Sequence, residues 1–227
     1  MDIEERSAIH AALGEPVRLA LADQLVAGDL SPSDLAQSLD LGTNLLAHHL
    51  KVLEAAGVIR RIRSEGDRRR SYVQLRLDNP IVRASVTGQG TAEPPRRVLF
   101  VCSANSARSQ LAAATWNSLS AVPAISAGTH PAVRVHPRAI TVAARHGLDL
   151  AHARPAALDD RLDPADLVVA VCDNAHEELD RDLPRLHWSI PDPAPHDTDT
   201  AFETAYAELN SRVRHLAALH PDHREAS

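Results

Sequence analysis

The sequence predicts two domains of different class: a mainly α-helical domain that ends in a β-hairpin, followed by an α/β domain with an open parallel sheet. Residues 1–86 contain helical patterns and then two segments in which apolar and polar residues alternate. Residues 97–227 alternate strand-like and helix-like segments. Between these two parts, residues 87–96 are small, polar and rich in Gly and Pro, which predicts a linker.

The composition limits the possible classes of protein. The chain has 227 residues, 44% of them hydrophobic and only 3% aromatic, so we expect two cores rich in Leu, Val and Ala. The net charge of −6 gives no overall attraction to nucleic acid, so DNA binding would need a local basic patch. There are two cysteines, no apolar leader and no run of ~18 apolar residues, which predicts a cytoplasmic protein with no disulfide framework and no membrane contact.

Four helices and a hairpin are expected in residues 1–86. Pro16 suits the first position of a helix, and the pattern Ser-Pro-Ser-Asp at 31–34 is typical of a helix start. The expected helices run over about 3–13, from Pro16 to a stop at Gly28, from 31 through Leu39, and from 42–43 to Gly57. Residues 58–63 and 71–77 then alternate apolar with polar around a turn at 65–67, which predicts a β-hairpin.

Helix, helix, short turn, helix and hairpin together make a winged helix-turn-helix. Residues 45–58, with the core His-His-Leu-Lys-Val-Leu, closely resemble the recognition helix of ArsR-type winged-helix repressors. The resemblance covers residues 1 to about 80, and it implies a homodimer that places this helix in the major groove of double-stranded operator DNA. The candidate DNA-contacting residues of this helix are Thr43, Asn44, Ala47, His48 and Lys51.

The predicted hairpin is strongly basic. Seven arginines fall between residues 60 and 76, against the two acids Glu65 and Asp67. Such a wing suits contact with DNA phosphates, and its three consecutive arginines, Arg68, Arg69 and Arg70, are the main candidates. The alternative is a solvated charged hairpin without a partner.

We expect neither a metal site nor a thiol sensor in the first domain. Side chains of neighbouring helical residues point about 100° apart, so His48 and His49 do not converge on one ion. Many ArsR-type repressors sense arsenite or metals through cysteines in or near the recognition helix. This chain has no cysteine before Cys102, so any sensing must lie elsewhere.

The most informative motif begins the second domain. The apolar run 98–101 leads to Cys102, Arg108 follows after five residues, and a helical pattern starts near Ser109. Backbone N–H groups of such a loop and of the helix N-terminus bind a tetrahedral oxyanion, and an arginine can clamp two of its oxygens. The same positive field favours a thiolate nucleophile at Cys102; the alternative is a small buried cysteine at a strand end. The predicted oxyanion-binding loop consists of Ser103, Ala104, Asn105, Ser106, Ala107 and Arg108.

The rest of this domain continues the α/β alternation. Strands are expected at 124–127, 166–171 and 186–189, and helices at about 108–120, 137–147 and 201–219. In an open parallel sheet, ligands bind at the carboxyl ends of the strands, which places the site at the end of the first strand.

Four motifs in order resemble the low-molecular-weight tyrosine phosphatase fold, and more closely its arsenate reductase branch. They are the loop 101–110, Ser126-Ala127-Gly128, the strand 168–173 that carries Cys172, and His187-Trp188 followed by Pro191-Asp192-Pro193. The resemblance covers about residues 97–219. It implies Cys102 as nucleophile, Arg108 as anion clamp and Asp192 as proton donor, with Ser109 donating to the thiolate and Asn105 bracing a strained loop. Asp192 could instead be a simple turn aspartate before proline.

This sequence departs from the family pattern mainly in the cysteines that would re-reduce the enzyme after it has reacted with arsenate. Ala104 and Ala107 replace a glycine and a second cysteine of the phosphatase loop, and Leu179 stands where a third reductase cysteine would follow Cys172. A three-cysteine relay is therefore impossible. Either Cys172 resolves Cys102 directly, or an external thiol (thioredoxin or a low-molecular-weight thiol) does, and Cys172 could equally be a buried strand residue. No tyrosines follow Asp192 to stack a phosphotyrosine ring, which disfavours a protein tyrosine phosphatase.

The sequence therefore predicts an arsenic-responsive DNA-binding regulator fused to an arsenate reductase-like enzyme, with no tightly bound cofactor. Its expected ligands are an oxyanion (arsenate, phosphate or sulfate) or arsenite. Two alternatives remain open. The second domain could be a non-catalytic sensor of oxyanion or arsenite, or a low-molecular-weight phosphatase.

Overall fold

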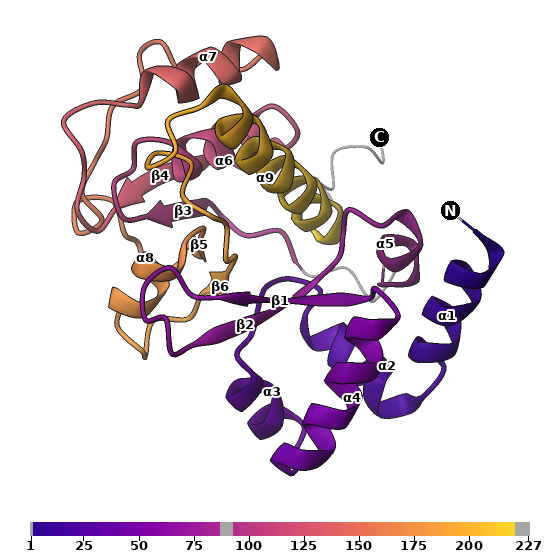
Figure 1. The fold of residues 1–227 in the computed structure, drawn as a ribbon. Helices are drawn as coiled ribbons and strands as arrows, with labels where there is room; N and C mark the ends of the chain where they lie inside the picture. The colour runs from indigo at the N-terminus through magenta and orange to yellow at the C-terminus, as the bar shows by residue number, and fades with distance from the viewer. Residues whose placement is uncertain (1, 87–92, 221–227) are drawn as a thin grey trace. The chain divides into compact units, whose positions relative to one another are not determined.

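The computed structural model describes residues 2–86 and 93–220 and divides the chain into two compact units, Met1–Gln89 and Gly90–Ser227 (Figure 1). Residues 87–92 of the predicted linker 87–96 lie outside the described residues. Within the described ranges, no helix is long and apolar enough to cross a membrane.

The first unit consists of helices and one antiparallel hairpin. Its elements are α1 (Ile3–Leu13), α2 (Pro16–Gln24), α3 (Pro32–Ser38), α4 (Thr43–Ala55), β1 (Ile59–Arg63), β2 (Ser71–Leu75) and α5 (Pro80–Val86). Local sequence explains the helix starts: Glu15 accepts hydrogen bonds from two backbone N–H groups at the start of α2, and Ser31 and Asp34 form a capping box on α3. In the hairpin, Ile59 pairs with Leu75. The predicted winged helix-turn-helix architecture is confirmed.

Two details of the first unit differ from the expectation. Helix α2 ends at Gln24 rather than near Gly28, and α5 was not predicted. Helix α5 has seven residues, too few to show a helical period, but it buries Val82 and Val86. The pair Asn79-Pro80 is a helix-start signal in the sequence. In the structure, the Asn79 side chain accepts a hydrogen bond from the N–H of Ile81.

The second unit is an open parallel sheet of four strands in the order β4-β3-β5-β6, in agreement with the predicted fold class. The strands are β3 (Val98–Cys102), β4 (Ala124–Gly128), β5 (Leu167–Ala170) and β6 (Leu186–His187). The helices are α6 (Arg108–Asn117), α7 (Pro137–Arg145), α8 (Asp173–Glu178) and α9 (Asp199–Leu219), of which the six-residue α8 was not predicted. The carboxyl ends of parallel strands share one edge, and Cys102 ends β3, an inner strand with a neighbour on each side.

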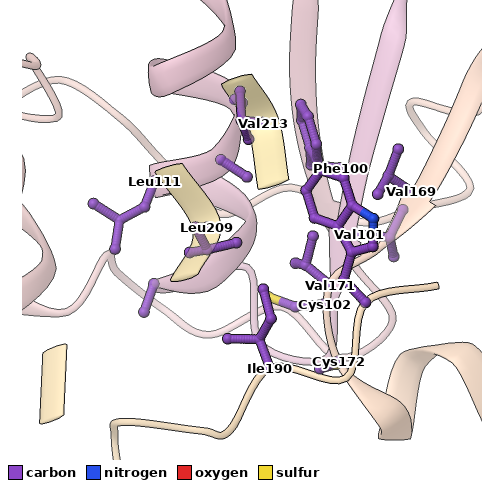
Figure 2. Close-up of a cluster of buried hydrophobic side chains, with 14 of the residues drawn as sticks. Phe100, Val101, Cys102, Leu111, Val169, Val171, Cys172, Ile190, Leu209 and Val213 are labelled. Carbon is purple, nitrogen blue, oxygen red and sulfur yellow. The ribbon is translucent and has the colours of Figure 1, made fainter. Parts of the chain in front are cut away.

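The core of the second unit forms around β3, whose five residues are all buried. Phe100 packs against both tryptophans of the chain, with ring centroids 6.3 Å from Trp116 and 5.9 Å from Trp188. Figure 2 shows the aliphatic side chains of Leu111, Leu209 and Val213 in the same cluster. All of β3, including Cys102 at its end, is packed in this core, and close packing holds the Cys102 side chain in a fixed place.

An ion pair joins the starts of the two central strands. Arg97 precedes β3 and donates through Nε and one terminal nitrogen to the two carboxylate oxygens of Asp166, both at 2.7 Å. Asp166 precedes β5, and its side chain is only 3% exposed. The bidentate geometry fixes the alignment of β3 and β5 at the end opposite to Cys102.

Candidate functional site

The loop after β3 is held by a neighbouring segment, residues 129–136, which we call the rim. The backbone N–H groups of Thr129, His130, Ala132 and His136 donate to the carbonyl oxygens of Cys102, Ser103, Ala104 and Ser106 at 2.8–3.2 Å. Every described peptide bond is trans, and across a trans peptide the C=O and the following N–H point in opposite directions. The N–H groups that follow these four carbonyls, on Ser103, Ala104, Asn105 and Ala107, therefore point away from the rim. Such an arrangement of amides suits an oxyanion.

Asn105 occupies the sharpest point of this loop. Its φ of 47° lies in the left-handed region, which asparagine tolerates better than most residues. Its side-chain oxygen accepts from the N–H of Ala156 at 2.9 Å and from the amide of Gln110 at 3.1 Å. Its side-chain nitrogen donates to the hydroxyl of Ser109 at 2.8 Å. The fully buried Asn105 thus ties the strained loop both to α6 and to the chain segment at 156.

The sulfur of Cys102 faces Ser109, at the first turn of α6. Sγ of Cys102 and Oγ of Ser109 are 3.0 Å apart, and both side chains are buried. Because the Ser109 hydroxyl already accepts from Asn105, its own hydrogen is available for the sulfur.

Arg108 connects the loop to the segment that follows β6. One terminal nitrogen donates to the carbonyl of Ile190 at 2.8 Å, and the other lies 3.0 Å from Oδ2 of Asp192. The arginine side chain is 4% exposed and that of Asp192 is 36% exposed. The other oxygen of Asp192 accepts from the N–H of Ala194 at 3.2 Å. The structure therefore brings Arg108, Cys102 and Asp192 to one edge of the sheet, where a nucleophile, an anion clamp and a proton donor would have to meet.

Cys172 is buried, but it lies just after the neighbouring strand rather than on it as expected, because β5 ends at Ala170 and Cys172 is the N-cap of α8. Its sulfur accepts from the N–H of Ala175 at 3.4 Å and lies 3.7 Å from the hydroxyl of Ser103. Burial raises the pKa of the Cys172 thiol, and the positive charge of Arg108 opposes that rise. Figure 2 shows Cys102 and Cys172 at the same end of the buried cluster. In the described conformation, Ser103 contacts Cys172 while Ser109 contacts Cys102.

Two residues that support the loop were not predicted from the sequence. Gln110 is 6% exposed, and its side-chain amide also donates to the backbone carbonyls of Asn105 and Arg154, each at 3.2 Å. Gly128 ends β4, where an added Cβ would lie 2.6 Å from the carbonyl oxygen of Ser103. The sequence signal for Gln110 was its position in the first turn of a helix expected to pack on the sheet. A glutamine buried there must hydrogen-bond to nearby groups, and the nearest are those of the loop. No signal in the sequence alone shows that the loop lies against Gly128.

The first unit has a separate candidate site on α4. Leu46, His49, Leu50 and Leu53 are buried on one face of this helix. The opposite face is exposed and carries all five predicted DNA-contacting residues, namely Thr43, Asn44, Ala47, His48 and Lys51. His49 faces Glu15, with Nδ1 3.5 Å from a carboxylate oxygen, so it serves the packing of α4 on α2.

The hairpin turn exposes the three consecutive arginines. Arg68, Arg69 and Arg70 are all exposed, but Asp67 holds Arg69 by two hydrogen bonds of 2.9 Å and lies 3.7 Å from Arg70. The hydrogen bonds from Arg69 lower the pKa of Asp67 to about 2, so this carboxylate is charged at neutral pH. The wing is therefore basic, but one internal acid already pairs with two of its arginines.

The described side chains contain no cluster suited to a metal ion. Across residues 2–86 and 93–220, no group of three or more His, Cys, Asp or Glu side chains is arranged to hold one.

Comparisons with known proteins match each half of the chain. A family model described as low molecular weight phosphotyrosine protein phosphatase matches residues 97–224, and a helix-turn-helix domain model matches residues 13–62. Arsenate reductase 1 of Bacillus cereus is 32% identical over 137 residues, which cover 55% of this chain and 96% of that protein. The predicted fusion of these two kinds of domain is confirmed.

Solved structures resemble the second unit. An arsenate reductase from Archaeoglobus fulgidus is 38% identical over 52% of this chain and 97% of its own, with a TM-score of 0.46. A tyrosine phosphatase from Erwinia amylovora is 21% identical over 59% of this chain and 97% of its own, with a TM-score of 0.51, a likeness of fold. Through residues 97–224, which follow its helix-turn-helix domain, the chain belongs to the low molecular weight phosphotyrosine protein phosphatase family.

Proposed function

We propose that this protein is an arsenic-responsive transcriptional regulator whose second domain reduces arsenate to arsenite at Cys102. The observation that carries the proposal is the convergence of Cys102, Arg108 and Asp192 at one edge of the sheet, with Arg108 3.0 Å from Asp192. The 32% identity to an arsenate reductase over 137 residues favours arsenate as the anion. An oxyanion that enters the loop would bind Arg108 in place of Asp192, which pairs with this arginine in the structure.

The first step joins the enzyme to arsenic. The Cys102 thiolate attacks the bound arsenate, a sulfur–arsenic bond forms, and one arsenic–oxygen bond breaks. Asp192, in its protonated form, gives its proton to the departing arsenate hydroxyl, which leaves as water. Arg108 and the loop amides balance the charge on the remaining oxygens, and the Ser109 hydroxyl stabilises the attacking thiolate.

The second step needs a second thiol, which supplies the remaining electrons. A thiolate attacks the sulfur of Cys102, so that a disulfide forms and the sulfur–arsenic bond breaks. The electron pair of that bond goes to arsenic, which leaves as arsenite; two thiols have then been oxidised. Cys172 or an external thiol, either thioredoxin or a low-molecular-weight thiol, fills this role. The burial of Cys172, which raises the pKa of its thiol, favours the external thiol in the described conformation.

The first domain would bind operator DNA as a homodimer of the ArsR type. The exposed face of α4 and the arginines of the wing support this proposal. Because no cysteine lies in this domain, we place the arsenic response at Cys102 in the second domain. Coupling of ~1–3 kcal/mol between the two domains would change DNA affinity several-fold or more.

A turnover assay tests the enzymatic half of the proposal. The intact chain should release arsenite from arsenate with at least one of three donors: thioredoxin with its reductase, glutathione or another small thiol. Cys102→Ser should abolish this release, whereas Cys172→Ser should abolish it only if Cys172 is the resolving thiol. A chain that binds arsenate but forms no arsenite with any donor would instead be an oxyanion sensor.

Operator binding tests the regulatory half. DNA affinity should be measured with and without arsenite, arsenate and phosphate, for the intact chain and for Cys102→Ser. We expect arsenic to change the affinity of the intact chain only. An equal change in both proteins, or in neither, would exclude Cys102 as the sensor.

Phosphatase activity is the second candidate function, since Cys102, Arg108 and Asp192 could equally transfer the phosphoryl group of an ester. The family model that matches residues 97–224 describes phosphatases. Hydrolysis of p-nitrophenyl phosphate that exceeds arsenate reduction with every donor would support this function over the first.

A further inference from the structure

The segment that carries Asp192, residues 191–197, is short and contains three prolines, and it is held by contacts from outside the loop that carries Cys102. After Asp192 the chain turns, and the N–H of Asp197 donates to the carbonyl of Pro193 at 3.2 Å. Asp197 has a φ of 43°, in the left-handed region, and Thr198 then caps α9. A left-handed residue is tolerated only where its surroundings fix it, so residues 193–197, which we call the acid turn, need contacts that hold them in place.

Arg138, in the first turn of α7, makes those contacts. Its Nε donates to Oδ1 of Asp197 at 2.7 Å, and one terminal nitrogen donates to Asp199. These two acids lie on either side of Thr198, the residue at which the acid turn becomes α9. The hydrogen bond to Asp197 raises the pKa of Arg138, consistent with a close charged pair.

The same short segment also holds the anion loop. Two residues before Arg138, the backbone N–H of His136 donates to the carbonyl of Ser106 at 2.8 Å. The His136 ring caps α7, stacks on Phe202 of α9 at 4.6 Å, and lies 3.6 Å from Asp197. Residues 136–138 therefore touch the loop that carries the nucleophile and the turn that follows the proton donor. A cavity of about 490 Å³ lies beside them, lined among others by Arg134, Arg138 and Asp197.

We propose that Arg138 is a positioning residue for Asp192: by holding Asp197 it fixes the acid turn, and with it the reach of the Asp192 carboxyl to the leaving oxygen above Cys102. This inference rests on the proposed role of Asp192 as proton donor. Arg138 does not contact the reacting atoms in this scheme. Its loss should therefore affect the delivery of the proton and leave the anion loop and nucleophile intact.

Arg145 offers a matched control. It lies on the same helix and also bonds Asp199, at 2.8 Å, together with Glu203 at 3.2 Å. Its ion pairs go to α9 and not to Asp197, so Arg145→Gln removes a comparable exposed ion pair but leaves the acid turn held. Both arginines are partly exposed, at 38% and 48%, so neither substitution should unfold the domain.

The test uses two aryl phosphates whose leaving groups differ in their need for a proton. In the transfer, a sulfur–phosphorus bond forms at Cys102, the phosphorus–oxygen bond breaks, and the leaving oxygen takes the proton of Asp192. Phenolate needs that proton more than p-nitrophenolate, because phenol is the weaker acid. The ratio kcat/KM reports this step even where a later step limits kcat. We expect Arg138→Gln to lower kcat/KM about tenfold for phenyl phosphate and less than twofold for p-nitrophenyl phosphate, while Arg145→Gln changes both less than twofold.

A double variant decides whether Arg138 acts through Asp192. Asp192→Asn alone should show the same split between the two esters, and Arg138→Gln should add no further loss in that background. An equal loss for both esters in Arg138→Gln, or a full additional loss on top of Asp192→Asn, would overturn the positioning role.

A measurement without turnover separates this proposal from the proposed function. Amide hydrogen exchange of the non-proline residues among 192–199 should become faster in Arg138→Gln and stay unchanged in Arg145→Gln. A wild-type chain that acts on neither arsenate nor the two esters would contradict the proposed function. Equal exchange rates in Arg138→Gln and Arg145→Gln would overturn the positioning role of Arg138, whichever substrate the wild-type chain acts on.

Discussion

The hydroxyl of Ser109 lies 3.0 Å from the sulfur of Cys102, and its direction is set by a third residue. Asn105 donates to this hydroxyl at 2.8 Å, so the hydroxyl hydrogen is directed to the sulfur rather than to the amide. Asn105, whose left-handed φ bends the loop, therefore also orients the hydroxyl that faces the Cys102 sulfur. The shape of the loop and the hydrogen bond to Cys102 depend on one side chain.

Ser109→Ala should slow the reaction of Cys102 with iodoacetamide at neutral pH by roughly 10- to 150-fold, because a hydrogen bond to a charged group, here the proposed thiolate, contributes about 1.5–3 kcal/mol. Mass spectrometry of the alkylated peptide would follow Cys102 separately from Cys172. Ser118→Ala is the control, since its hydroxyl bonds the carbonyl of Thr115 away from the loop. Equal rates in wild type and Ser109→Ala would show that the serine does not donate to the sulfur.

Replacing Arg68, Arg69 and Arg70 together with alanine should weaken binding to all duplex sequences. The slope of log K against log salt should fall by about 1 for each DNA phosphate that the variant no longer neutralises. Electrophoretic or fluorescence titration at several salt concentrations measures this. Arg6→Ala, which removes an exposed arginine from α1, should leave the slope unchanged. An unaltered slope in the triple variant would exclude the wing from phosphate binding.

Asp67→Asn should have the opposite effect on DNA affinity. The asparagine removes the carboxylate that holds Arg69 by two hydrogen bonds, so Arg69 and Arg70 become available to phosphates. We expect tighter binding and a steeper salt dependence, measured in the same titrations. Weaker binding would indicate that Asp67 instead shapes the turn that presents the arginines.

Asp166→Asn should lower the stability of the second unit by roughly 1–2 kcal/mol at pH 7, because it breaks a bidentate pair whose arginine is one-third exposed. Burial by itself raises the pKa of Asp166, but the hydrogen bonds and charge of Arg97 outweigh it and the net shift is downward from 3.8. A lowered pKa in the folded state means that the contribution is complete above pH 3.8 and is lost as pH falls through the lowered value.

Thermal melts at several pH values test whether the contribution of Asp166 to stability is lost as pH falls. The difference in Tm between wild type and Asp166→Asn should be constant near neutrality and shrink below about pH 4. Arg96→Gln, at an exposed neighbouring position, should not change Tm. A difference that grows towards low pH would contradict the assignment.

Gly128→Ala should weaken phosphate binding to the second unit by tenfold or more. The new Cβ would lie 2.6 Å from the carbonyl of Ser103 and 3.0 Å from the backbone nitrogen of Asn105, so the anion loop must move. Gly147→Ala is a matched control, because its φ of 74° makes alanine strained by roughly 1–2 kcal/mol although the added Cβ meets nothing within 4 Å. Calorimetric titration with phosphate should separate the two, since Gly147→Ala loses stability and keeps its affinity.

The parts of the molecule that could be predicted are those whose structure depends on residues close together in the sequence. The sequence around Cys102 contains a buried strand, a cysteine, an arginine after five residues and a helix start within a short stretch of chain. The arrangement of strand, loop and helix could therefore be predicted from this stretch alone, and the binding of an anion by the loop stays a prediction. The exposed face of α4 was predictable for the same reason, because helical periodicity separates Leu46 and Leu50 from Thr43 and His48.

Contacts between distant segments could not be predicted. The fit of Gly128 against Ser103 depends on the pairing of β3 with β4, and the hold of Arg138 on Asp197 depends on how α7 packs beside α9. Helices α5 and α8 have only seven and six residues, so they are formed by burial of a few side chains rather than by a periodic pattern. The role of Cys172 also depends on such contacts, since its surroundings include Ser103 and Arg108.

The two tryptophans that pack against Phe100 give this protein an intrinsic optical label. Trp116 and Trp188 are the only indole side chains in the sequence, and both belong to the unit that carries Cys102. Indole fluorescence therefore reports the melting of that unit alone, while circular dichroism records the helices of both. Because the N–H of Ile190 donates to the carbonyl of Trp188, and Ile190 in turn accepts from Arg108, emission from Trp188 should also change when an anion binds to the loop, without any dye attached.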